Sequence, residues 1–334
     1  SKCYMKKVII FGATGTVGAY TSLFLKDLGY DVIAVGRRKS DNNFFSDHQI
    51  SYYSIDISDS ESFEVLPHKN IEAVLDFAGA MPAKMEGYNP YEYVNTIVMG
   101  TLNVLEYAKR INCNRFVFSQ SISDILYLFG SENKISADVE RRFPVTGDHS
   151  VYSICKNAAV NFIEHYAVTY NFKYFILRLP TIYAYHGSPY YYVNGERKYL
   201  AYRLLIEKAM RGEPIEVWGN PAQKKEITYI KDLLQIIRGC LETTVQGGIY
   251  NVGTGVGVSL EEQIDGIIEV FSSKNNPSPK IYCPSKPSSP QFVLDITKTQ
   301  TDLGYTPKYG YLEYLRDMKD EMEMNRFNKL WGDA

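Results

Sequence analysis

The chain has 334 residues, of which 45% are hydrophobic and 22% are charged, and its formal net charge is -2 at pH 7. This length is typical of one globular enzyme with a main domain and a smaller lobe, and the mixed signs of the charges give no indication of a nucleic-acid or membrane surface. The five cysteines are widely spaced and form no CxxC or Cys/His cluster, so we expect no disulfide framework, no metal site and a reduced, cytoplasmic location. No apolar run approaches the ~18 residues of a transmembrane helix, and the first residues lack the apolar segment of a signal peptide.

The chain begins with a predicted strand, turn and helix. An apolar run over 7–11 ends at Gly12, and residues 20–28 predict a helix closed by Gly29. The turn between them has a GxxGxxG pattern, whose glycines permit a tight turn, close approach of the backbone to a pyrophosphate and close packing of helix on strand. The pattern predicts a dinucleotide site formed by Gly12, Thr14, Gly15, Thr16, Val17 and Gly18.

The end of the second predicted strand, 31–35, indicates which dinucleotide is bound. NAD enzymes of this fold place an acidic residue there, which hydrogen-bonds the adenosine ribose hydroxyls. Here Gly36 occupies that position and is followed by Arg37 and Arg38, whose guanidinium groups can bind a 2′-phosphate through charge-assisted hydrogen bonds. The sequence therefore predicts NADP, with NAD as the alternative, while a solvated basic turn is the other interpretation of the arginines.

Strands and helices continue to alternate along the chain. Apolar runs predict further strands at 50–55, 73–77, 115–118 and 174–177, and helical spacing predicts the clearest helices at 91–110 and 152–170. Because short connections between parallel strands are right-handed, this alternation predicts an α/β fold with a doubly wound parallel sheet of the Rossmann type. Its ligand crevice is expected at the carboxyl ends of the strands.

The pattern changes after Pro180. Segments 183–198 and 275–290 are rich in Tyr, Gly, Pro or Ser and are expected to form loops over a cleft. We therefore expect a nucleotide-binding domain over 1–180, to which 226–252 return. A smaller, discontinuous C-terminal substrate lobe is expected over 181–225 and 253–330.

Tyr152 and Lys156 are the strongest candidates for chemistry. Four residues are slightly more than one helical turn, so both side chains project from the same helix face, where a cation can stabilise tyrosinate. This spacing alone is weak in a chain with 28 tyrosines. Combined with the upstream GxxGxxG turn, it resembles the short-chain dehydrogenase/reductase superfamily.

Further motifs narrow the resemblance. In chain order they are Asn95-Thr96-Ile97-Val98-Met99-Gly100-Thr101-Leu102-Asn103-Val104-Leu105, Phe118-Ser119-Gln120-Ser121, Arg178-Leu179-Pro180-Thr181-Ile182-Tyr183, Tyr229-Ile230-Lys231-Asp232 and Tyr250-Asn251-Val252-Gly253. Together they resemble the extended enzymes of the nucleotide-sugar epimerase/dehydratase family. The resemblance implies that Tyr152 is the acid/base at a sugar C4 oxygen and that Ser121 makes a second hydrogen bond to that oxygen. It implies that Lys156 binds the nicotinamide ribose and lowers the pKa of the phenol.

The resemblance also implies contacts to cofactor and substrate. Asp56 and Ile57 correspond to the adenine contact, and Phe77, Ala78 and Gly79 are expected alongside the cofactor. The residues expected to contact the nucleotide sugar are Ser121, Ser123, Thr181, His186, Lys225 and Lys286. The two lysines replace arginines of the family, and solvated surface lysines are the alternative interpretation. The expected assembly is a homodimer.

Absent residues restrict the reaction. Ser121 is followed by Ile122 and Ser123 instead of the Asp-Glu pair of 4,6-dehydratases, which disfavours dehydration. Ser123 also replaces the cysteine of the 3,5-epimerases, and a hydroxyl is a much poorer base than a thiol. The sequence predicts an NADP-preferring 4-keto reductase or 4-epimerase acting by hydride transfer at C4 of a nucleotide-linked sugar. The alternatives are an NAD-dependent epimerase and a non-catalytic, NADP-binding regulator on the same fold.

Overall fold

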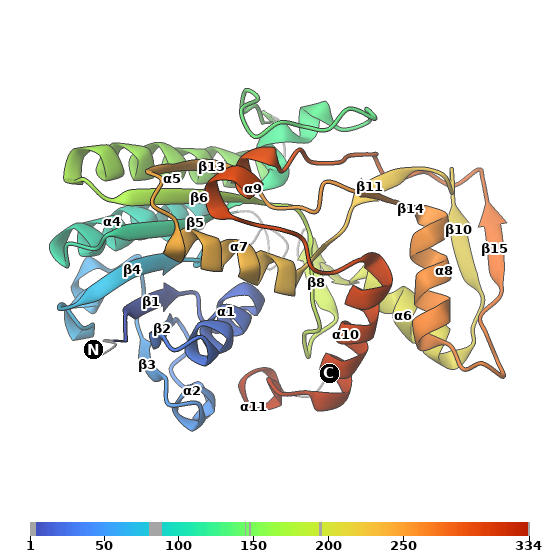
Figure 1. Cartoon of the computed structure of the whole chain (residues 1–334), viewed down its shortest axis with the longest axis horizontal. Helices are drawn as coiled ribbons and strands as arrows, with labels where there is room; N and C mark the ends of the chain where they lie inside the picture. Colours follow the sequence, from blue (N-terminus) through green and yellow to red (C-terminus); the bar gives the residue numbers. More distant parts are fainter. Residues whose placement is uncertain (1–4, 80–88, 144, 147, 194–195, 333–334) are drawn as a thin grey trace.

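The core of the molecule is a seven-stranded sheet in the order β13-β6-β5-β4-β1-β2-β3 (Figure 1). The computed structural model describes residues 5–79, 89–143, 145–146, 148–193 and 196–332. Every neighbouring pair of these strands is parallel, and the strand order reverses between β1 and β4. The strands are β1 (Lys7–Phe11), β2 (Asp31–Gly36), β3 (Ser51–Ser54), β4 (Ile71–Asp76), β5 (Arg115–Ser121), β6 (Lys173–Leu179) and β13 (Gly247–Asn251). The predicted doubly wound fold is confirmed.

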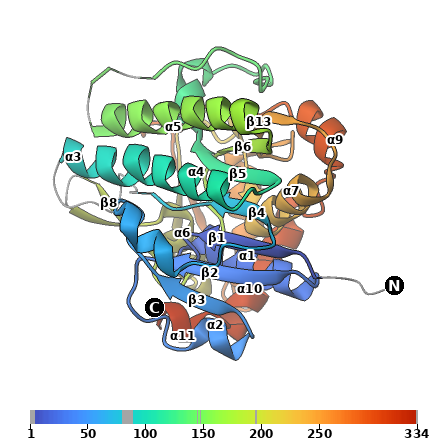
Figure 2. The same ribbon diagram turned by 90° about the vertical axis from the view of Figure 1, so that its left-hand side faces the viewer.

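Helices cover both faces of this sheet. Successive residues of a strand point to opposite faces, so Val8 and Ile10 of β1 join one buried cluster while Ile9 and Phe11 join another. The first cluster lies under α1 (Thr16–Asp27) and α7 (Ile230–Glu242), which contact each other. The second lies under α4 (Gly100–Arg110) and α5 (Asp148–Tyr170), which run side by side in Figure 2. Both faces are buried, which explains the continuous apolar runs of the strands.

The predicted helix over 91–110 consists of three consecutive helical segments, of which the middle one is π-helical. They are α3 (Pro90–Tyr93), a π-helical segment (Val94–Met99) and α4. Asn89 caps its start, because its side chain accepts a hydrogen bond from the Tyr91 amide. The remaining short helices of this region are α2 (Phe44–Asp47) and two 3-10 segments, Ser60–Val65 and Ile122–Leu128.

The rest of the chain builds a smaller lobe beside the carboxyl ends of the strands (Figure 1). Its helices are α6 (Ala201–Arg211), α8 (Leu260–Phe271) and α10 (Tyr311–Met324). Its two-stranded sheets pair β10 (Ile215–Trp218) with β15 (Lys280–Cys283), β11 (Lys224–Glu226) with β14 (Gly257–Ser259), and β12 (Thr228–Tyr229) with β7 (Ile182–Tyr183). The chain adds α9 (Thr297–Leu303), which packs on α7 and β13, and α11 (Asn328–Trp331).

Two segments predicted as loops contain strands. Residues 183–198 include most of the antiparallel hairpin of β8 (Tyr190–Val193) and β9 (Glu196–Tyr199), in which the ring of Tyr190 packs edge-on against that of Tyr199, 5.2 Å away. Residues 275–290 include β15. The cross-strand aromatic pair explains the first difference, since such pairs stabilise strands that composition alone marks as loops.

Within residues 226–252, α7 packs against the large sheet and β13 forms its edge strand next to β6. The division into a domain and a substrate lobe at the predicted boundaries stays a prediction. Among the residues that the structure describes, no helix is both long and apolar enough to cross a membrane.

Candidate active site

The glycine turn between β1 and α1 has no space for side chains at two positions. Gly12 has a φ of +76°, and a Cβ there would lie 2.7 Å from the carbonyl oxygen of Phe77. A Cβ on Gly18 would lie 2.1 Å from the Gly12 oxygen. Gly15 caps α1, whose first residue is Thr16. The turn therefore has the compact backbone at a helix N-terminus that a pyrophosphate requires, and it fits the predicted dinucleotide.

The contacts of the turn after β2 offer a second explanation for the residues that predicted NADP. A Cβ on Gly36 would lie 2.9 Å from both the Thr14 methyl group and the Tyr52 hydroxyl, so close packing explains why no acidic residue stands there. The Arg38 guanidinium donates to the carbonyl oxygen of Leu330 in α11. Arg37 is exposed and acts electrostatically on Asp56. Neither the missing acid nor Arg38 therefore needs a 2′-phosphate as its explanation.

The remaining predicted cofactor residues line the same strand ends. Asp56 accepts hydrogen bonds from the amide and hydroxyl of Ser58, which lower the pKa of its carboxyl. The Ile57 side chain packs against Gly100 at the start of α4. Phe77 hydrogen-bonds the Phe11 carbonyl oxygen through its amide, and Ala78 and Gly79 continue from the end of β4. All five residues therefore follow β3 or β4 near the glycine turn.

The structure brings the three predicted catalytic side chains together. Ser121 ends β5, and Tyr152 and Lys156 lie one turn apart on α5. The Ser121 hydroxyl lies close enough to the Tyr152 phenol to lower its pKa. The ammonium of Lys156 lies 5.9 Å from the centre of the Tyr152 ring and donates to the Ser119 carbonyl oxygen at 2.9 Å. This is the spatial arrangement that general acid/base catalysis needs.

The pKa of Tyr152 is shifted in the direction opposite to the predicted one. Burial raises the pKa of Tyr152 to about 12, and the nearby Ser121 hydroxyl lowers it only in part. Lys156 is buried as well, which lowers its own pKa to about 8, and its ammonium lies over the ring of Phe118 at 4.6 Å. Lys156 therefore does not depress the phenol's pKa in this arrangement. Tyr152 is a neutral phenol at pH 7, the form that donates a proton.

Asp76, at the end of β4, is a charged residue of this centre that sequence reasoning missed. Its side chain is 1% exposed, and burial raises its pKa to about 7 while the nearby Lys156 ammonium lowers it. A Cβ on Gly79 would lie 3.8 Å from the same ammonium, so the chain after β4 runs directly past Lys156. An acid directly after the apolar run 73–75 was the signal in the sequence.

The model of the NAD dependent epimerase/dehydratase family matches residues 8–253. The chain belongs to this family. The predicted resemblance is thereby confirmed, and with it an enzyme with a dinucleotide cofactor of the NAD(P) type.

Individual members of the family are distant in sequence. The putative UDP-glucose 4-epimerase of Methanocaldococcus jannaschii is 23% identical over 319 residues, which are 95% of this chain and 99% of that protein. UDP-glucose 4-epimerase 2 of Arabidopsis thaliana is 22% identical over 344 residues, 94% of each chain. The relatives therefore match nearly the whole length of this chain.

Solved structures agree in fold. The UDP-glucose 4-epimerase of Thermotoga maritima, crystallised with UDP-glucose, has a TM-score of 0.75 at 22% identity and covers 96% of this chain and 99% of its own. The UDP-glucuronic acid 4-epimerase of Bacillus cereus in complex with NAD has a TM-score of 0.71 at 21% identity, covering 95% and 98%. The epimerase/dehydratase architecture thus extends over nearly the entire chain.

Within this epimerase/dehydratase fold, two of the predicted substrate residues have structural partners. Ser123 is buried, and its hydroxyl accepts a hydrogen bond from Ser153 at 3.0 Å. The His186 ring stacks on Trp331, with centroids 4.0 Å apart. Thr181 is exposed just after β6. Substrate contact by these three residues stays a prediction.

The two predicted phosphate-binding lysines belong to the smaller lobe. Lys225 lies in β11 opposite Val258 of β14. Lys286 is exposed, and its ammonium lies 5.2 Å from the centre of the Trp218 ring. The solvated-surface interpretation fits Lys286 as well as the diphosphate interpretation does, so both roles stay predictions.

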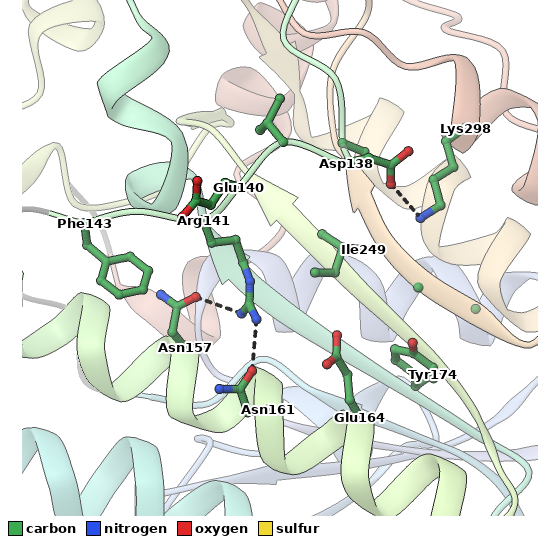
Figure 3. A pocket seen from close by; sticks show the side chains of 14 residues that line it. Asp138, Glu140, Arg141, Phe143, Asn157, Asn161, Glu164, Tyr174, Ile249 and Lys298 are labelled. Atoms are coloured by element: carbon green, nitrogen blue, oxygen red, sulfur yellow. Dashed lines mark hydrogen bonds and ion pairs between the residues drawn. The ribbon is translucent and has the colours of Figure 1, made fainter.

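A polar network involves Asn157 and Asn161 of α5. Asn157, which follows Lys156, donates to the Ser153 carbonyl oxygen at 2.8 Å and accepts from Arg141 at 2.8 Å. Arg141 also donates to Asn161 at 2.9 Å (Figure 3). These groups line a hollow of about 640 Å³ that neither Tyr152 nor Lys156 lines. The hollow therefore lies beside the catalytic face of α5 and is separate from the candidate site.

A buried ion pair fixes the end of β5 to β6. Arg178 and Asp124 have fully buried side chains joined by two hydrogen bonds of 2.9 and 3.0 Å, and Arg178 also donates to Asn251 of β13. The motif match included Arg178, but its partners lie 54 and 73 residues away in sequence. Such a pair positions the strand end that carries Ser121, because an unpaired charge in the protein core would strongly destabilise the fold.

Proposed function

We propose that this protein is an NAD-dependent epimerase that inverts C4 of a UDP-linked sugar. The observation that carries the proposal is the convergence of Ser121, Tyr152 and Lys156 at the end of β5, beside the glycine turn. The relatives named UDP-glucose 4-epimerase support the C4 reaction and the uridine nucleotide. They favour the predicted alternative, an NAD-dependent epimerase, over the NADP-preferring reductase.

Tyr152, Ser121 and Lys156 would each have a separate role in the reaction at C4. NAD, when bound, supplies the acceptor and donor of the C4 hydride. Tyr152 would exchange the proton of the C4 oxygen, and Ser121 would hold that oxygen through a second hydrogen bond. Lys156 would bind the ribose hydroxyls of the cofactor as an ammonium. Oxidation removes the hydroxyl proton from O4 and a hydride from C4. Return of the hydride to the opposite face of the ketone, and of a proton to its oxygen, would complete the inversion without net redox change.

NAD is favoured over NADP by the contacts of the turn after β2. Arg38 is engaged by Leu330, and Gly36 is explained by the packing of Thr14 and Tyr52. The Bacillus cereus structure of the same fold contains NAD. We therefore propose NAD as the working cofactor.

The substrate side is proposed on the smaller lobe. Lys225 and Lys286 would pair with the diphosphate as point charges, and Thr181 and His186 would contact the sugar side. The substrate lobe would consist of 181–225 and 253–330. A homodimer and a cytoplasmic location stay predictions.

The decisive experiment is a redox balance. The protein is incubated with NAD and either UDP-glucose or UDP-galactose, and both sugars are quantified over time with the absorbance of reduced cofactor. Interconversion of the two sugars without net absorbance change is the expected result. In a parallel incubation with NADPH and a 4-keto nucleotide sugar, consumption of one NADPH per sugar would support a reductase instead. Binding of cofactor without turnover of any nucleotide sugar would support the regulator.

A further inference from the structure

The short helix α11 contacts the cofactor turn and the substrate side at once. The indole N–H of Trp331 donates to the Thr14 carbonyl oxygen at 2.7 Å, within the glycine turn. The same ring stacks on His186 at an interplanar angle of 24°. The Gly332 carbonyl oxygen approaches Gly187 so closely that a Cβ there would lie 2.6 Å from it. One residue thus bridges two loops that belong to opposite sides of the candidate site.

This segment is firmly attached to the molecule. The Phe327 ring is buried and lies 4.4 Å from that of Tyr20 in α1. The Lys329 ammonium pairs with Asp47 of α2, and α11 lies beside α2 in both Figure 1 and Figure 2. Arg38 donates to the Leu330 carbonyl oxygen. Because α1, α2 and the turn after β2 all hold α11, the position of Trp331 is well defined.

The bond to Thr14 completes the hydrogen bonding of the glycine turn. The Gly12 oxygen accepts from the Gly15 amide at 3.2 Å, and the Gly15 oxygen accepts from the Ala19 amide at 2.9 Å. The Thr14 oxygen instead accepts from the Trp331 side chain. The turn's amides are the groups that bind phosphate, so an external donor to a carbonyl orients the turn without consuming an amide.

We propose that Trp331 is a positioning residue of the cofactor turn and that α11 couples this turn to the loop carrying His186. This inference rests on the proposed function, in which the turn binds NAD. Phe at position 331 would retain the stacking on His186 but would lack the N–H donor. Its expected effect is a local loosening of the cofactor turn with the rest of the fold retained.

Matched tryptophan variants test the proposal, since Trp331 and Trp218 are the only two tryptophans of the sequence. The Kd for NAD is measured by calorimetry in the parent, Trp331→Phe and Trp218→Phe proteins, with thermal unfolding recorded without ligand. Loss of one hydrogen bond predicts a Kd about 3- to 10-fold higher in Trp331→Phe and an unchanged Kd in Trp218→Phe. In Trp218→Phe, the emission of the remaining Trp331 should change saturably with NAD.

The outcomes separate the positioning role from the proposed function. An unchanged Kd in Trp331→Phe, with the parent binding NAD, would overturn the positioning role alone, even if the melting temperature falls, since α11 would then be only a stabilising element. Trp331 fluorescence that does not change on addition of NAD would overturn the coupling. Failure of the parent to bind NAD or NADP would overturn the proposed function together with this inference.

Discussion

Asp76 and Lys156 are buried side chains of opposite charge that act on each other across the end of β4. Asp76 is the register partner of Phe118 in β5, and the Lys156 ammonium lies over the ring of Phe118. Among the described residues, Lys156 is the one charged group that affects the pKa of Asp76, and Asp76 is the one that affects the pKa of Lys156. The charge of the lysine proposed to bind cofactor therefore depends on a carboxylate at the end of a different element, β4.

The first prediction concerns the pH dependence that this relationship creates. Burial lowers the pKa of Lys156 to about 8, and the negative charge of Asp76 partly offsets this decrease. Asp76→Asn removes the opposing effect, so the pKa of Lys156 falls below about 8 and the loss of kcat/KM on the alkaline side begins at lower pH. Asp76→Glu, which keeps the charge, should retain the parent profile. Superimposable alkaline limbs for the parent and Asp76→Asn would contradict this role.

A second prediction concerns Tyr152 as the proton donor and acceptor. Tyr152→Phe removes only the hydroxyl, so NAD binding should persist while epimerisation slows by ~100- to 10,000-fold. In the Tyr152→Phe background, Ser121→Ala should reduce turnover by a much smaller factor than it does in the parent protein, because the two groups act on one oxygen. Tyr166→Phe, near the far end of the same helix, is the matched control and should stay close to parent turnover. More than about a tenth of parent turnover in Tyr152→Phe would disprove its role.

A third prediction separates the two arginines after β2. Arg38→Ala should lower the free energy of unfolding by about 1 kcal/mol, because the Leu330 carbonyl oxygen loses its charged donor. The ratio of the Kd values for NAD and NADP should not change. Urea denaturation and calorimetry measure the two quantities, with the exposed Arg37→Ala as control. A selective tenfold loss of NADP affinity in Arg38→Ala would restore the interpretation of Arg38 as a 2′-phosphate ligand.

A fourth prediction tests why Gly36 is glycine. Gly36→Ala forces a Cβ to within 2.9 Å of Thr14 and Tyr52, which should cost about 1–3 kcal/mol of unfolding free energy. Tyr52→Phe removes the hydroxyl from this contact, so the double variant should recover part of the loss. Gly310→Ala is the control, since the nearest atom to its Cβ would lie 3.4 Å away. Equal unfolding midpoints for Gly36→Ala and the parent would show that packing does not exclude a side chain there.

Local patterns predicted the fold because the hydrophobic periodicity of each strand and helix can be read from its own short stretch of sequence. The glycine turn, the strands over 31–36 and 71–76, and the helix carrying Tyr152 all have periodicities set by neighbours in sequence. The π-helical segment and the β8–β9 hairpin were missed, since side-chain packing between strands and helices decides them. Boundaries differed by a few residues for the same reason.

The site was predicted only where a motif carries it. Ser121, Tyr152 and Lys156 converge as expected, but the charge state of Tyr152 depends on burial, which the sequence does not display. Trp331 meets Thr14 across 317 positions of the chain, and no local pattern indicates such a contact. For the same reason, the sequence could not indicate that Arg38 donates to the Leu330 carbonyl oxygen in α11.

The pairing of β13 with β6 has a consequence for how the protein is made. Gly247 aligns with Tyr174, so the large sheet gains its last strand only after α6, β10 and α7 have been synthesised. Until then β6 is an exposed edge, with unpaired backbone groups beside the strand that leads to Ser121. Loop-closure entropy makes such a distant pairing slow. A ribosome-bound chain that stops before residue 247 should therefore remain sensitive to protease and prone to associate, and the completed sheet should appear in a single late step.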